Sequence, residues 1–71
     1  MIAKITSKSE LTLNLTQHFV FDILDGNTVI LTSQVVEAIP SNAEAEIKSR
    51  LDAFVAEYEV SQDIEVGLEI T

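Results

Sequence analysis

The stretch that decides the fold is residues 11–23, with the sequence LTLNLTQHFVFDI. Six of its seven odd-numbered positions carry a large apolar side chain, whereas Val20 is the only such residue at an even-numbered position. A repeat of two residues is typical of a β-strand, because successive side chains of a strand point to opposite faces. The pattern therefore predicts an extended strand over residues 11–23 with one buried face.

The segment that follows has the composition of a hairpin turn. Gly26 tolerates a positive φ angle, and Asp25 and Asn27 suit the hydrogen bonds of a turn. We expect a second strand to begin at Thr28 and to continue to about Ala38.

Two loop lengths fit this turn. A three-residue loop pairs odd positions with odd positions, which places Ile23 opposite Val29 and Phe21 opposite Leu31. A two-residue loop pairs odd positions with even ones. We favour the three-residue loop, because it brings more apolar residues to the face that already carries phenylalanine and leucine.

A helix is predicted after the second strand. Pro40 ends that strand, because proline has no N–H for the sheet. Ser41 and Glu44 have the spacing of a capping box, in which each side chain bonds the backbone N–H of the other residue. The helix is expected over residues 42–59. Its apolar stripe, with spacings typical of one helix face, consists of Ile47, Leu51, Phe54 and Tyr58.

Both ends of the chain also carry strand patterns. Residues 63–70 alternate between apolar and acidic or small side chains, which predicts a strand with one buried face. Residues 2–6 fit a short strand at the start. The predicted class is α+β: a single domain over 1–71, with a small, mostly antiparallel sheet in the order β-β-β-α-β and one helix packed on one face.

The length of the long strand conflicts with the size of the domain. A straight strand over residues 11–24 would measure about 45 Å, whereas a compact domain of this length is about 29 Å across. In one reading the strand bends near Gln17 and His18 and folds back over the core. In the other, its first half projects, and its three leucines pack on another chain.

The second reading divides the chain into a projecting strand arm, residues 1–16, and a hairpin–helix–strand body, residues 17–71. The candidate protein-interface residues are Ile2, Ile5, Leu11, Leu13, Leu15 and His18. Residues 1–20 carry two bases and one acid, a charge of +1, whereas residues 21–71 carry two bases and eleven acids, a charge of −9. A slightly basic arm would suit an acidic neighbour, although acids also simply keep a small domain in solution.

Composition argues against several kinds of site. The chain has no Cys and one His, which excludes a disulfide framework, a cysteine-based zinc site and a thiol nucleophile. The net charge of −8 argues against a basic nucleic-acid-binding surface. His18 has no second His and no Cys with which to complete a catalytic site. We expect no enzymatic activity, cofactor, metal or small-molecule substrate.

The expected function is therefore a structural or assembly role with protein partners, as a homo-oligomer or in a larger assembly, without contact to a membrane or to nucleic acid. Small α+β subunits that bind through strand arms are typical of virus particles. We expect a small virion component of a tailed phage, either a capsid cement or decoration protein or a head–tail or tail connector. The N-terminal residues lack the apolar run of a secretory signal, so the expected location is the virion if the chain is phage-encoded, and otherwise the cytoplasm.

An alternative comes from the acids. Six acidic residues between Asp52 and Glu69 have no base among them. They suit a solvated face, but they also suit an acidic inhibitor or nucleic-acid mimic, of the phage counter-defence type, that blocks a basic groove of a partner protein.

Overall fold

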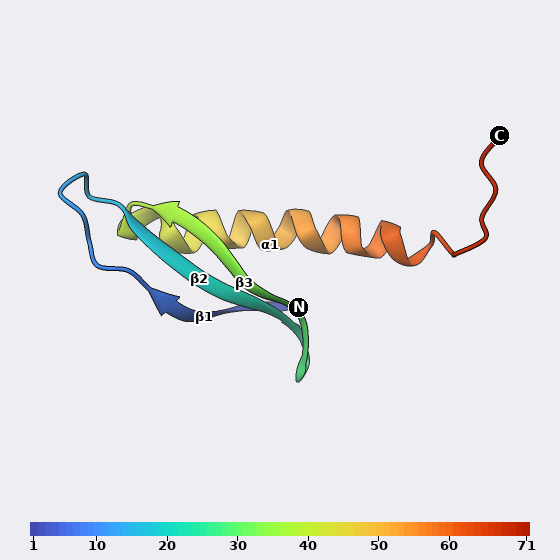
Figure 1. The fold of residues 1–71 in the computed structure, drawn as a ribbon, viewed down its shortest axis with the longest axis horizontal. Helices are drawn as coiled ribbons and strands as arrows, with labels where there is room; N and C mark the ends of the chain where they lie inside the picture. The colour runs from blue at the N-terminus through green and yellow to red at the C-terminus, as the bar shows by residue number, and fades with distance from the viewer.

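The computed structural model describes residues 1–71 and contains three β-strands followed by one α-helix (Figure 1). The elements are β1 (Ile2–Lys8), β2 (Gln17–Asp25), β3 (Thr28–Ala38) and α1 (Pro40–Gln62). The strands form one antiparallel sheet in the order β1-β2-β3. α1 lies against one face of this sheet. The predicted α+β class and the order β-β-β-α are confirmed.

The central strand β2 begins later than predicted. It starts at Gln17, so the expected strand is wrong over residues 11–16. Both neighbouring strands end at this point, because Gln17 pairs with Ala38 at the end of β3 and Phe19 pairs with Lys8 at the end of β1. Without neighbours, the backbone N–H and C=O groups of a strand have no partners, and the chain adopts a different conformation there.

The length conflict is thus resolved by a loop. Residues 2–8 of the expected arm pair with β2 inside the sheet. Residues 9–16 form the connection between β1 and β2, which extends past the end of the sheet (Figure 1). The strand neither folds back over the core nor continues as an isolated arm.

The hairpin between β2 and β3 has a two-residue loop, since Asp25 pairs with Thr28, and the predicted three-residue loop is wrong. Gly26 adopts a φ of 61° in this turn, which glycine accepts without steric cost. Register shifts on either side of Ile23 then bring it opposite Leu31. The shifts give one odd-to-odd pair, Ile23 with Leu31, whereas the predicted pairs of Ile23 with Val29 and of Phe21 with Leu31 do not form: Val29 pairs with Leu24, and Gln34 pairs with Phe21.

The helix α1 begins two residues before its predicted start and ends three residues after its predicted end. Its N-cap is Ile39, and no side chain caps the first turn, so the predicted capping box of Ser41 and Glu44 does not form. Pro40 lies in the first turn instead, where its fixed φ suits a helix and its missing N–H costs no hydrogen bond.

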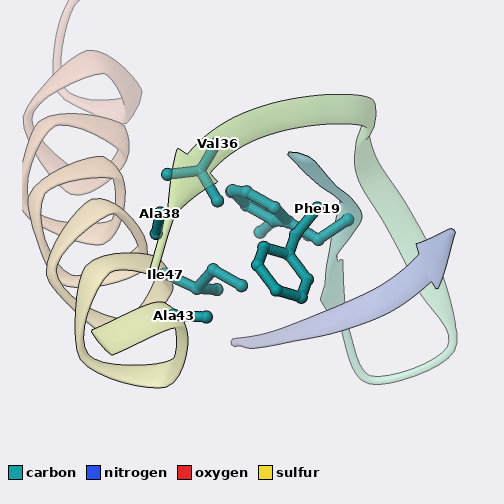
Figure 2. Close-up of a cluster of buried hydrophobic side chains, with 7 residues drawn as sticks. Phe19, Val36, Ala38, Ala43 and Ile47 are labelled. Carbon is teal, nitrogen blue, oxygen red and sulfur yellow. The ribbon is translucent and has the colours of Figure 1, made fainter. Parts of the chain in front are cut away.

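The core is small and lies where the first half of α1 crosses the sheet. Figure 2 shows its side chains gathered between the helix and the strands. The buried apolar residues are Phe19, Phe21, Ile23, Val36, Ala38, Ala43 and Ile47. On α1, burial decreases along the predicted apolar stripe: Ile47 is buried, whereas Leu51, Phe54 and Tyr58 are only half-buried.

The molecule is elongated. Its radius of gyration is 15.3 Å, whereas a compact chain of this length has about 11 Å. The second half of α1 and the segment after it extend beyond the sheet (Figure 1). The strand predicted over residues 63–70 is not formed, because this segment leaves the far end of α1 and meets no sheet edge of its own chain. No helix combines the length and the apolar character that crossing a membrane requires.

Candidate protein interface

The loop over residues 9–16, called the leucine loop below, exposes three large apolar side chains. Leu11, Leu13 and Leu15 are 54%, 103% and 60% exposed. They belong to the predicted interface residues, and their own chain does not bury them. Three exposed leucines in one short segment are unusual on the surface of a soluble monomer and are typical of a site that another protein covers.

Hydrogen bonds among the polar residues hold the leucine loop in shape. The backbone N–H of Thr12 donates to the carbonyl of Thr16 at 3.0 Å, and the two hydroxyl groups lie 3.1 Å apart. At the base of the loop, Gln17 Nε2 donates to the carbonyl of Ser9 at 2.7 Å, and the backbone N–H of His18 donates to Ser9 Oγ at 2.9 Å. The polar groups of the loop thus bond to one another and to the end of the sheet, and the three leucines lie on the outside.

His18, another predicted interface residue, lies beside this loop on the face of the sheet that α1 leaves open. Its Nε2 is 2.8 Å from Glu37 Oε2 on the neighbouring strand, and both side chains are about half exposed, at 53% and 55%. The two residues are direct partners in the register of β2 and β3. The His18 side chain therefore contacts Glu37 across the two strands at the surface, and the backbone of His18 helps to anchor the leucine loop.

The two remaining predicted interface residues lie elsewhere. Ile2 and Ile5 line an open groove of about 380 Å³ between β1 and α1. The register places Ile5 opposite Phe21, so its side chain is on the helix-facing side of the sheet. The other residues lining the groove are Met1, Ala3, Glu44, Ile47, Lys48 and Leu51. The structure thus separates the six predicted residues into the region of the leucine loop and this β1–α1 groove.

Sequence reasoning missed a third apolar surface. Residues 63–70, called the tail below, follow α1 and are exposed throughout. The apolar side chains that the prediction placed on a buried strand face are all open to solvent: Ile64, Val66, Leu68 and Ile70. The same alternation that predicted a strand is therefore the signal for an apolar surface without a partner in its own chain.

The total exposed area supports the idea of a missing partner. The chain exposes 5556 Å², whereas a folded monomer of this mass exposes about 4,400 Å². The difference is roughly 1,200 Å², which exceeds the roughly 800 Å² that one partner buries in a standard protein–protein interface. A second molecule could cover this excess without disturbing the fold.

No cluster of three or more His, Asp or Glu side chains that could hold a metal ion is present. No known protein family, curated protein or solved structure shows a significant match to the chain.

Proposed function

We propose that this protein is a non-enzymatic assembly subunit that binds neighbouring proteins through exposed apolar surfaces. The observation that carries this proposal is the leucine loop, in which hydrogen bonds hold three leucines outward. Burying these side chains against a partner would contribute roughly 3–6 kcal/mol of binding free energy. Such a site suits docking on a protein surface, because it offers apolar area on a preformed loop and little loop entropy is lost on binding.

The setting we propose is the virion of a tailed phage, where the protein would act as a capsid decoration protein or as a connector at the neck or tail. Small size supports this role, as does an architecture in which an apolar loop extends from one end of the sheet and an apolar tail from the end of the helix (Figure 1). In this setting the leucine loop docks on another virion protein.

The test uses virus particles purified from a culture that produces this chain, with quantitative mass spectrometry of the particle fraction. We expect the chain at a fixed copy number per particle. A variant with Leu11→Ser, Leu13→Ser and Leu15→Ser should fold but stay outside the particle, whereas Val29→Ser, which changes an exposed apolar residue near the hairpin turn, should still be incorporated.

Two outcomes would contradict the proposal. Absence of the chain from purified particles would remove the virion role. Salt-sensitive binding to a basic protein that is unchanged by the leucine substitutions would instead favour the acidic inhibitor, because that activity depends on the carboxylates.

A further inference from the structure

One edge of the sheet is free beside an apolar groove. β1 pairs with β2 on one side and has no strand on the other. A free edge presents N–H and C=O groups to which a further strand can bond. The β1–α1 groove, with Ile5 and Leu51 among its lining residues, lies next to this edge. An added strand could therefore satisfy the backbone of β1 and fill the groove at the same time.

The tail has the pattern that this edge requires. As an extended strand its eight residues would measure about 26 Å, and the seven residues of β1 measure about 23 Å. Its apolar side chains alternate with Asp63, Glu65, Gly67 and Glu69. When the apolar side chains share the helix-facing side with Ala3 and Ile5, the acidic ones point to the opposite face.

Charge distinguishes β1 from the other free edge. β1 carries Lys4 and Lys8 and no acid, whereas β3 carries Glu37 and no base. Lys4 is on the face away from α1, because its partner in the register, Asp22, is on that face, and it forms no ion pair there. If the tail adds to the edge of β1, its acids meet a lysine. If it adds to the edge of β3, they meet a carboxylate instead.

The donor of the strand is a second molecule. α1 extends beyond the sheet, and the tail continues from its far end, away from the β1 of its own chain (Figure 1). The excess exposed area of roughly 1,200 Å² is enough for a stable interface. Resting on the proposed assembly function, we infer that the tail of one copy adds to the edge of β1 of a second copy, and that the exchange is reciprocal in a two-fold dimer.

Sedimentation velocity of the full chain between low and high micromolar concentrations tests this inference. We expect a dimer whose Kd rises at least about tenfold with Val66→Pro, because proline removes a backbone N–H and resists the strand. The matched control is Thr71→Pro, which lies outside the alternating segment and should leave the Kd unchanged. Circular dichroism of both variants should match the unsubstituted chain, since the tail contributes nothing to the core.

Hydrogen exchange then locates the contact. In the dimer, the amides of β1 and of the tail should exchange slowly, and Val66→Pro should speed both. A monomer at all concentrations would overturn the inference. A monomer with protected β1 amides would show that the tail folds back on its own chain, and a dimer indifferent to Val66→Pro would place the contact elsewhere.

Failure of this inference and of the proposed function can be told apart. The triple leucine variant should still dimerise, because the inferred contact pairs the tail with β1, Ile2–Lys8, and uses none of the three leucines. If this variant dimerises but is not incorporated into particles, the leucine loop is needed for incorporation and not for the dimer. A chain that is incorporated but never dimerises would refute only the tail exchange.

Discussion

The backbone N–H of Ser33 donates to Oδ1 of Asp22 at 3.0 Å, across the β-bulge of β3. Ser33 adopts a φ of 55°, a conformation that residues other than glycine rarely adopt. The bulge sets Phe21 opposite Gln34 and Ile23 opposite Leu31. This side-chain hydrogen bond thus lies at the bulge that brings the apolar side chains of Ile23 and Leu31 opposite each other.

We expect Asp22→Ala to lower the free energy of unfolding by about 1 kcal/mol, because the N–H of Ser33 loses its acceptor at a partly exposed site. Urea denaturation measures this change. Glu57→Ala, which removes an exposed carboxylate without a hydrogen-bond partner in the structure, is the control and should change stability much less. Equal effects of the two substitutions would show that the bulge does not depend on Asp22.

Leu15 offers a second test, because it adopts a φ of 63°. The left-handed conformation costs a non-glycine residue about 1 kcal/mol or more. Leu15→Gly should therefore raise the free energy of unfolding by up to about 1 kcal/mol, reduced by the greater freedom of glycine in the unfolded chain. Leu13→Gly is the matched control: Leu13 has a negative φ, so its replacement should stabilise nothing. Both substitutions should weaken incorporation into particles, because each removes an exposed leucine. Leu15→Gly would then increase stability and decrease binding, which shows that the two effects of Leu15 are separate.

The leucine loop should become more mobile when the hydrogen bond between Gln17 and Ser9 is removed. Gln17 is the one buried polar residue, and its Nε2 donates to the carbonyl of Ser9. We expect Gln17→Ala to destabilise the chain by about 1–2 kcal/mol, since the carbonyl loses a part-buried donor. Hydrogen exchange of residues 9–16 should become faster, while that of β3 changes little. Unchanged exchange in the loop would mean that the threonine hydrogen bonds suffice to hold it.

Sequence patterns predicted the parts of the fold in which local pattern and packing agree. β2 from Phe19 to Ile23 alternates in the sequence and is buried as that alternation implies, because α1 covers one face of the sheet. The predicted apolar stripe of α1 packs on the core from Ile47, its most buried point, to Phe54, whereas Tyr58 lies beyond the core. In these segments the repeat of two or of 3.6 residues places apolar side chains on one face, and another element of the same chain packs on that face.

The errors occur where a segment alternates like a strand but has no adjacent strand in its own chain with which to pair. Residues 11–16 and 63–70 both alternate like strands, but β1 and β3 end beside Gln17, and no sheet edge of the same chain meets the tail. Alternation reports which side chains could share a face, whereas pairing depends on where other strands end. The candidate interface was therefore predicted for the leucines and missed for the tail.

The contact between the side chains of His18 and Glu37 should contribute little to the free energy of unfolding. Both side chains are about half exposed, and exposed ion pairs typically contribute between 0.2 and about 1 kcal/mol. A double-mutant cycle with His18→Ala and Glu37→Ala should give a coupling energy below about 1 kcal/mol. A larger coupling would indicate that the pair fixes the end of β2 and, through Ser9, the leucine loop.

The charge on β1 should affect dimer formation through the tail. Lys4→Glu places a carboxylate on the face where the acids of an added tail would point, so we expect the dimer Kd to rise several-fold at low salt. Arg50→Glu makes the same change in net charge on the other side of α1, in a surface hollow beside β3, and should raise the Kd less. Added salt should reduce the difference between the two variants, because it screens exposed charges. Combining Lys4→Glu with Glu65→Lys should recover part of the lost affinity, whereas equal effects of Lys4→Glu and Arg50→Glu would mean that only net charge matters and that the tail does not lie along β1.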